Sequence, residues 1–309
     1  MQLIRLLVAT IATTLALVDI VDGDVLLVPA EYPTIQEAIE AAVTGDEIEI
    51  AAGTYLLAEP IDTMGKAIEI RGVQDGDGTP LTIVDGSGVP QPIRIWQGEA
   101  SSTILRGLEI VGGTETSFGG VIRVVDSSPA IIDCTIKDGF AFFKGGGLLV
   151  QGSGTPLVQG CLFLDNGCGG GGGAIFVDDD ASLTVEESVI QSNTAQSGAG
   201  IYVNGFAEVQ LSGSTICSNT LGQISGPGQT VDLGGNVIGD SCDCPTGDLD
   251  SDQDGTPDCE DLCPNDPAKT EPGDCGCGVS DIDSDADGTP DCDDLCPNDP
   301  AKTEPGDCG

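Results

Sequence analysis

The sequence predicts an all-β fold in which short strands stack as the coils of a parallel β-helix, and three observations lead to this class. Between residues 117 and 219, a glycine followed by an apolar run returns four times, at intervals of 26 to 27 residues. A second apolar run follows each copy, and three copies end on an asparagine. The glycine runs cover 120–124, 147–150, 173–177 and 200–203, and the asparagines are Asn166, Asn193 and Asn219. A period in the twenties is typical of a solenoid rather than of a sandwich.

Stacking explains how such short runs reach stability. A single coil cannot bury its inward face, but coils stacked at roughly 4.8 Å pair their backbone groups with the coil above and below. The asparagines then fall in register at one corner, where their side-chain amides bond each other along the stack. We also expect them to occupy the left-handed backbone of that corner.

The chain begins with residues typical of a secretory signal peptide. A charged start at residues 1–5 precedes an apolar run over 6–18, which is too short to span a bilayer. We predict a signal peptide over 1–23, with cleavage after Gly23 preferred to cleavage after Ala16. A signal anchor is the alternative.

A short helix is predicted before the first coil. Thr34 and Glu37 form a capping box, and the apolar stripe that follows ends at Gly45. The stripe consists of Ile35, Ala38, Ile39, Ala42 and Val43. Alternating strands then follow over 47–50 and 67–71. A helix at this place would cover the open end of the solenoid.

Two groups of motifs resemble known families. Residues 32–39, 45–48 and 52–55 are similar to the N-terminal cap and first coil of the right-handed parallel β-helix superfamily that includes pectin lyases. The motifs at 172–175 and 163–166 resemble the repeats of bacterial polymorphic outer membrane proteins. The resemblance covers about residues 24 to 240 and implies a right-handed parallel β-helix. It does not imply one activity, because the superfamily holds lyases, hydrolases, esterases and non-catalytic adhesins.

The charge balance limits the classes of partner. The net charge is −41 and histidine is absent, so the surface repels nucleic acid, anionic membranes and polyuronate, and the commonest general base is missing. Seven basic residues precede position 145 in the solenoid, and none lies between 145 and 267. They are Lys66, Arg71, Arg94, Arg106, Arg123, Lys137 and Lys144. We interpret them as a solvated face rather than as substrate-holding groups.

One polar column is the best candidate for a glycan site in the solenoid. Gln151, Asp178 and Asn204 occupy equivalent positions on successive coils and should point outward together. Hydrolysis of a neutral glycan needs two carboxylates, and Asp179 and Asp180 lie beside Asp178. The alternative is a loop whose carboxylates only keep the solenoid soluble. We assign no catalytic residue. Nearby, Phe140, Phe142 and Phe143 either roof the core edge or dock a partner or sugar ring.

The composition changes at Cys242. Residues 243–309 hold 21 acidic and two basic residues, nine prolines and no aromatic residue, so they cannot bury a core of their own. The stretch 250–261 recurs almost unchanged as 283–294. Carboxylates at loop positions 1, 3, 5, 9 and 12, with glycine at 6 and a backbone carbonyl at 7, match the spacing of a calcium loop. Calcium is therefore the predicted cofactor, and a disordered acidic tail is the alternative.

The prolines after each loop exclude the helix that follows an EF-hand loop. The pattern with its Cys-Pro-Asn resembles thrombospondin type 3 repeats, in which calcium and disulfides replace a core. That resemblance implies the following ligands: Asp250, Asp252, Asp254, Thr256, Asp258 and Asp261 in the first loop, and Asp283, Asp285, Asp287, Thr289, Asp291 and Asp294 in the second. Cys275 and Cys277 depart from the family pattern, so its disulfide pairing does not transfer.

Nine of the thirteen cysteines lie from Cys242 onward, which favours disulfides and an oxidising compartment. An odd number leaves at least one thiol unpaired, and the second repeat stops at Gly309, as in a truncated chain. Cys134 and Cys161 lie on adjacent coils, either bridged or as two buried thiols.

The predicted organisation is a signal peptide over 1–23, a right-handed parallel β-helix over 24–241 and irregular calcium-binding repeats over 242–309. We expect a secreted or cell-surface bacterial protein that binds an extracellular glycan or a cell-surface protein, without enzymatic activity. Nucleic acid is not an expected partner, and no transmembrane span is expected in the mature chain. The alternative is an extracellular polysaccharide lyase or glycoside hydrolase.

Overall fold

A computed structural model describes residues 23–115 and 117–242. From the rest of the chain it describes 252–255, 263, 266–270, 275, 277, 279–286, 288–292, 294 and 296–300. The predicted signal peptide lies outside the described residues, apart from its last residue. Within the described part of the chain, no helix is long and apolar enough to cross a membrane.

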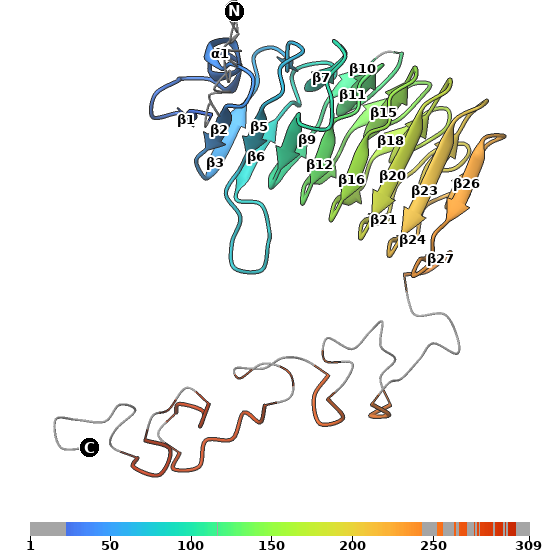
Figure 1. Ribbon diagram of the computed structural model, residues 1–309. Helices are drawn as coiled ribbons and strands as arrows, with labels where there is room; N and C mark the ends of the chain where they lie inside the picture. The colour runs from blue at the N-terminus through green and yellow to red at the C-terminus, as the bar shows by residue number, and fades with distance from the viewer. Residues whose placement is uncertain are drawn as a thin grey trace, which may run out of the picture.

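The chain from β1 to β27 is a parallel β-solenoid of about eight turns (Figure 1). Three long sheets form its walls, and every pairing between neighbouring strands in them is parallel. The nine-stranded sheet contains β1 (Val25–Val28), β2 (Glu47–Ile50), β5 (Glu69–Arg71), β8 (Ile104–Arg106), β12 (Ala130–Ile132), β16 (Leu157–Gln159), β20 (Ser182–Glu186), β23 (Glu208–Ser212) and β26 (Gln229–Asp232).

The other two walls complete each coil. The eight-stranded sheet contains β3 (Gly53–Leu56), β6 (Thr82–Asp85), β9 (Leu108–Val111), β13 (Thr135–Lys137), β17 (Leu162–Leu164), β21 (Val189–Gln191), β24 (Thr215–Cys217) and β27 (Val237–Gly239). The seven-stranded sheet contains β4 (Ile61–Asp62), β7 (Ile93–Ile95), β11 (Ile122–Val125), β15 (Leu148–Gln151), β19 (Ile175–Val177), β22 (Ile201–Val203) and β25 (Ile224–Ser225). A small three-stranded sheet, which the sequence did not predict, joins β10 (Thr114–Glu115), β14 (Phe140–Ala141) and β18 (Gly167–Cys168).

The predicted period is confirmed by the strand register. Leu148 pairs with Ile175, and Ile175 pairs with Ile201, which are steps of 27 and 26 residues. Inward side chains therefore stack on their equivalents from coil to coil. One such column in the nine-stranded sheet is fully buried and runs through Ile48, Ile70, Leu105, Ile131, Val158, Val185 and Leu211. Burying these aliphatic side chains is the main stabilising term of the solenoid.

The corner between the nine-stranded and eight-stranded sheets requires a left-handed backbone. Successive coils place Gly107, Asp133, Gly160, Glu187 and Gly213 there, with φ between 48° and 63°. Glycine adopts this conformation without strain, and a short polar side chain tolerates it. This requirement explains why apolar runs in the sequence are interrupted at a constant interval.

The predicted asparagine ladder is confirmed. Asn166 Nδ2 donates to Asn193 Oδ1 at 3.0 Å, and Asn193 Nδ2 donates to Asn219 Oδ1 at 2.9 Å. All three side chains are buried, and Gln223 accepts the last amide at 2.8 Å. The left-handed backbone lies one residue earlier than expected, at Asp165, Ser192 and Ser218. The asparagines thus satisfy buried backbone groups rather than supply the turn.

The predicted N-terminal helix forms as α1 (Ile35–Ala41), and the Thr34 Oγ1 accepts a hydrogen bond from the Glu37 backbone N–H at 3.2 Å. The helix ends earlier than the apolar stripe indicated, and Val43 is exposed. Lys66 explains the early end, because its Nζ donates to the carbonyls of Ile39, Glu40 and Ala42 at 2.6 to 2.9 Å. In a longer helix, carbonyls at these positions would accept hydrogen bonds from backbone N–H groups of the next turn.

A disulfide between Cys217 and Cys242 ties the end of the solenoid to β24. Two more disulfides, Cys263–Cys277 and Cys275–Cys292, link described residues of the C-terminal segment. Cys134 and Cys161 are not bridged and are buried free thiols. The cysteine usage therefore separates a reduced, packed solenoid interior from a disulfide-linked C-terminal segment.

Candidate functional site

The predicted polar column is present at the end of the seven-stranded sheet. Asn204 Nδ2 donates to Asp178 Oδ1 at 2.7 Å, and Gln151 Nε2 donates to Asp178 Oδ2 at 3.4 Å. The three side chains follow β15, β19 and β22, whose register places them on neighbouring coils. The structure thus brings together the three residues that the sequence singled out as a candidate glycan site.

Lys144 joins this column, although the sequence placed it on a solvated face. Its ammonium pairs with Asp178 Oδ2, and the Asp178 side chain is only 5% exposed. Burial raises the cost of ionising Asp178, but hydrogen bonds from Lys144 and Asn204 outweigh that effect and lower its pKa. Asp178 is therefore held as a carboxylate, with both oxygens occupied.

Aromatic rings surround the Lys144–Asp178 pair. The Lys144 Nζ lies 5.2 Å from the ring centroid of Phe176 and 5.6 Å from that of Phe118, which are cation–π distances. Phe176 stacks on Tyr202 with centroids 5.0 Å apart and an interplanar angle of 19°. Phe118 also contacts Phe143 at 5.9 Å. The pair thus lies between rings from three coils.

The three phenylalanines of the 140–143 loop are exposed, which decides between the two sequence interpretations. Ala141 points inward and is fully buried, whereas Phe140, Phe142 and Phe143 point outward and are 40 to 58% exposed. Phe140 and Phe142 pack edge to face at 5.4 Å. The cluster is therefore not a roof over the core and is available to a partner.

We define the aromatic surface as the five residues Phe118, Phe140, Phe142, Phe143 and Tyr202, beside the buried ring of Phe176, which is only 4% exposed. The chain has only 11 aromatic residues, and four of them contact the Lys144 ammonium or pack on a ring that does: Phe118, Phe143, Phe176 and Tyr202. The repeat alignment contained part of the signal, since Leu149, Phe176 and Tyr202 occupy one outward column in register. The Lys144 contacts carried no such signal, because that residue lies in a loop.

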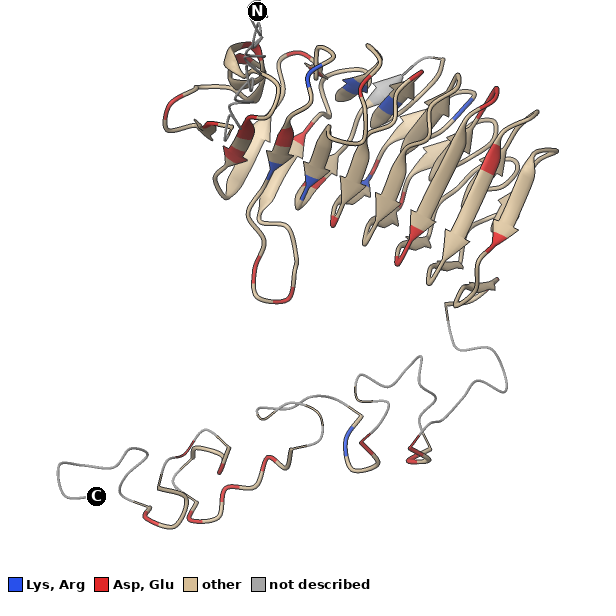
Figure 2. Cartoon of the chain, viewed as in Figure 1, with Lys and Arg blue, Asp and Glu red and all other residues tan. Residues whose placement is uncertain are grey.

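Four of the other basic residues have structural partners. Lys66 binds helix carbonyls, as described above, and Arg71 pairs with Glu47 and Glu49. Arg106 pairs with Glu69 at 2.9 Å, and Lys137 pairs with Glu109 at 3.0 Å. Figure 2 shows the solenoid's basic residues confined to its N-terminal and central coils. The contacts of these four residues agree with the sequence interpretation, in which the basic residues lie on the surface and do not hold a substrate.

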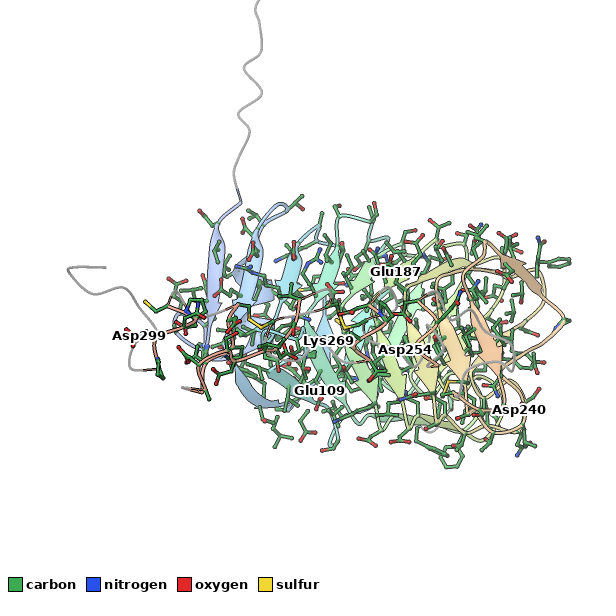
Figure 3. All side chains as sticks on the ribbon, turned by 90° about the horizontal axis from the view of Figure 1, so that it is seen from below. Glu109, Glu187, Asp240, Asp254, Lys269 and Asp299 are labelled. Carbon is green, nitrogen blue, oxygen red and sulfur yellow. A yellow bond between two sulfur atoms is a disulfide. The ribbon has the colours of Figure 1, made fainter. Side chains whose placement is uncertain are left out.

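The described residues of the two calcium loops have the same backbone conformation at two equivalent positions. Gln253 and Ala286 have φ near 60°, and Gly255 and Gly288 have φ near 100°, at equivalent positions of the two loops. In the second loop, Asp283 accepts the backbone N–H of Ala286 at 2.7 Å and of Gly288 at 2.9 Å. Asp250, Thr256, Asp258, Asp261 and Asp287 lie outside the described residues. The loops are drawn with their side chains in Figure 3, where Asp254 is labelled.

The predicted ligands in the second loop are oxygen donors of the kind calcium takes. Asp294 is buried, and its Oδ1 accepts the Cys296 N–H at 2.7 Å. Its buried Oδ2 has no hydrogen-bond partner in the described part of the segment. Asp291 accepts the side chain and the backbone N–H of Ser284, and these bonds lower its pKa. Asp252, Asp254, Asp285 and Thr289 are also described. Among the described residues, no three carboxylates or thiols already converge as a metal cluster.

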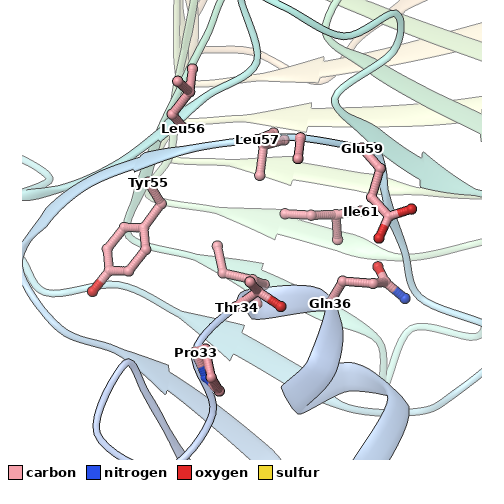
Figure 4. Close-up of a pocket in the computed structure, with 10 residues that line it drawn as sticks. Pro33, Thr34, Gln36, Tyr55, Leu56, Leu57, Glu59 and Ile61 are labelled. Carbon is pink, nitrogen blue, oxygen red and sulfur yellow. The ribbon is translucent and has the colours of Figure 1, made fainter.

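A separate apolar cavity lies beside the N-terminal cap (Figure 4). It has a volume of about 250 Å³ and is lined by α1 and the segment between β3 and β4. Tyr55 and Gln36 lie on its wall, but their polar atoms are used within the protein: the Tyr55 hydroxyl donates to the Ala51 carbonyl and Gln36 accepts the Asp62 N–H. The cavity therefore offers few free polar groups, unlike the aromatic surface.

The fold and this outward face define a parallel β-solenoid with a laterally exposed aromatic and polar site. Residues 93–242 match the family model described as the right handed beta helix region. No curated protein and no solved structure matches the chain. The family match includes every residue of the aromatic surface and the Gln151, Asp178 and Asn204 column.

Proposed function

We propose that the protein is a secreted or cell-surface glycan-binding protein, whose β-helix binds sugar rings on the aromatic surface. The observation that carries this proposal is a cluster of aromatic rings at the Lys144–Asp178 pair in a chain that has few aromatic residues. Phe118 and Phe176 contact the Lys144 ammonium, and Phe143 and Tyr202 pack on those two rings. The apolar face of a sugar ring packs on an aromatic ring, and its hydroxyls need nearby donors and acceptors. The half-buried amides of Gln151 and Asn204, beside the occupied carboxylate of Asp178, supply both.

Tyr202 is the central residue of this proposal. Phe176 covers one side of it, while its next neighbour in the outward column is the small side chain of Ser225. Tyr202 is half-buried, so it is already fixed before a ligand arrives. A rigid, preorganised ring loses little conformational entropy on binding.

Polysaccharide lyase or glycoside hydrolase activity is the alternative, and the geometry favours binding. Proton donation by Asp178 needs a raised pKa, whereas the contacts of Lys144 and Asn204 lower it. A second carboxylate, Asp179, accepts the Gly152 N–H at 3.2 Å and so joins the corner of its coil to that of the preceding coil. The site therefore holds one occupied carboxylate rather than an acid and a base.

We further propose that the C-terminal segment acts as a calcium-stiffened spacer or attachment arm. Support comes from the shared backbone of the two acidic loops and from the buried, unpartnered Oδ2 of Asp294. When bound, calcium would neutralise carboxylates that otherwise repel each other, and the residues that would hold it in the second loop include Asp283, Asp291 and Asp294. The disulfides Cys263–Cys277 and Cys275–Cys292 restrict the same segment.

The experiment is a binding screen of the full-length protein against neutral and acidic glycans, with sugar release measured in the same wells. Tyr202→Ala and Phe143→Ser should each weaken glycan binding about tenfold, as expected from the loss of one well-packed aromatic contact. Phe206→Ser is the matched control, because Phe206 is 91% exposed and lies outside the aromatic surface. Multiple turnover of any glycan would overturn the non-catalytic function, and equal losses in the control would overturn the site.

A further inference from the structure

Two arginines of the seven-stranded sheet differ from every other basic residue in the solenoid. Arg94 on β7 and Arg123 on β11 are direct register partners, so their backbones are one strand spacing apart, roughly 4.8 Å. Among the described side chains, neither guanidinium has a carboxylate within ion-pair distance. Like charges placed opposite each other on neighbouring strands destabilise a sheet. Two like charges therefore lie on neighbouring strands without an ion-pair partner among the described residues.

The contacts of the two guanidiniums leave donors unused. Arg94 lies over the Trp96 ring at 5.2 Å and donates to the Pro90 carbonyl at 3.4 Å. Arg123 donates to Gln151 Oε1 at 3.2 Å. The Nε atoms of both side chains are buried and have no hydrogen-bond partner among the described residues. Each side chain is thus oriented by neighbours that carry no negative charge.

The nearest carboxylates on this face are already occupied. Asp62, the register partner of Arg94, accepts hydrogen bonds from the Trp96 Nε1 at 3.0 Å and the Gln97 Nε2 at 3.1 Å. Asp178 is paired with Lys144. Asp62 keeps its charge, but neither it nor Asp178 forms an ion pair with Arg94 or Arg123 among the described residues. The two guanidiniums therefore lie near carboxylates without being bound by one.

We infer that Arg94 and Arg123 form an oxyanion subsite, which binds a sulfate or carboxylate group carried by a sugar. This inference rests on the proposed glycan binding and gives the ligand its chemical class. Guanidinium groups bind such oxyanions through paired, charge-assisted hydrogen bonds. Arg123 lies three strand spacings from Tyr202 in the same outward column, roughly 14 Å away. A short acidic oligosaccharide lying along the solenoid axis would reach both.

The test compares charged and neutral forms of one polymer on the full-length protein. Dextran sulfate against dextran reports on sulfate, and polygalacturonate against its methyl ester reports on carboxylate. The double variant R94Q/R123Q should weaken binding of the preferred charged form at least tenfold and leave the neutral form unchanged. The control is R71Q/R106Q, which removes the same charge from arginines paired with glutamates on the nine-stranded sheet.

The outcomes separate this inference from the proposed function. Loss of binding in Tyr202→Ala but not in R94Q/R123Q overturns the oxyanion subsite and leaves glycan binding standing. If R94Q/R123Q loses glycan binding and Tyr202→Ala retains it, the oxyanion subsite is supported and the aromatic site is overturned. Equal losses in R94Q/R123Q and R71Q/R106Q overturn the subsite, because they show a general charge effect. Titration of sucrose octasulfate gives an independent readout, and its binding should be lost only in R94Q/R123Q.

Discussion

The ammonium of Lys144 lies against the ring of Phe176 while it pairs with the buried carboxylate of Asp178. One cation thus joins a loop, the end of a strand and an aromatic stack. Removing it as Lys144→Met should leave Asp178 buried and short of a donor, at a cost of about 1–3 kcal/mol. Urea unfolding of the variant measures this cost.

Lys137→Met is the control for that measurement. Lys137 pairs with Glu109 at 3.0 Å, but both side chains are more accessible than Asp178. An accessible ion pair contributes only about 0–1 kcal/mol. Equal losses in the two variants would show that the Lys144–Asp178 pair is an ordinary surface pair.

Asp178 also predicts a pH dependence. The pKa of Asp178 in the folded chain lies below its ordinary value. Its ionised form therefore stabilises the fold at pH values above the pKa of an aspartate in the unfolded chain, which is about 3.9. This stabilisation is lost as the pH falls through the lowered folded pKa. The difference in Tm between the wild type and Asp178→Asn should therefore be large at pH 7 and shrink below pH 4. A difference that is constant from pH 7 to pH 3 would contradict the lowered pKa.

The asparagine ladder predicts a large stability effect from one buried amide. Asn193→Ala removes the donor to Asn219 and the acceptor for the Asn166 amide and backbone N–H. Leaving these buried groups unpaired should cost about 3 kcal/mol. Gln210→Ala is the comparison, since its amide bonds only the neighbouring Glu208 among the described contacts. Thermal unfolding of both variants tests whether the ladder stabilises the stack.

The Cys217–Cys242 disulfide should hold the last coil in place. It closes a 25-residue separation, for which loop entropy gives about 3 kcal/mol. In Cys242→Ser, amide hydrogen exchange should become faster in β26 and β27 and remain unchanged in β12 and β16. Uniformly faster exchange along the solenoid would instead mean that the coils unfold as one unit.

Calcium binding is testable on the full chain by titration calorimetry. Two acidic loops predict saturation at about two ions per chain. Asp294→Asn should weaken one of the two sites, because it neutralises the buried carboxylate. Asp240→Asn removes the same charge from an exposed position near the end of the solenoid and should leave both sites intact. Absence of calcium heat in the wild type would overturn the ligand assignment.

The sequence predicted those features that repeat. The glycine runs, the asparagine ladder and the Thr34 N-cap each follow from a local pattern, and the structure confirms them. The described contacts do not include the return bond of the capping box, in which the Thr34 N–H donates to the Glu37 side chain. Features that depend on contacts between loops were not predictable. Lys66 ends α1 from 24 or more residues away, and Lys144 reaches Asp178 across 34 residues. Contacts between residues so far apart in the sequence leave no signal in the local pattern.

The candidate site was predicted in its polar half only. Gln151, Asp178 and Asn204 share a repeat position, so the alignment of coils revealed them. The aromatic half comes from two kinds of place: strand positions such as Tyr202, and the loop around β14. Two-residue strands leave no periodic signal, so the exposure of Phe140 and its neighbours required the three-dimensional structure.

Because each coil pairs only with the coils before and after it, the chain tolerates length changes in whole units. Duplication of one unit of 26 or 27 residues between β15 and β19 would extend the outer face by roughly 4.8 Å and preserve every column. Insertion of one residue within a strand would shift the inward side chains outward in that coil, whereas loops take up extra residues, as the 35-residue step from Ile70 to Leu105 shows. Homologous chains should therefore differ in coil number by integers, with longer members offering room for longer ligands.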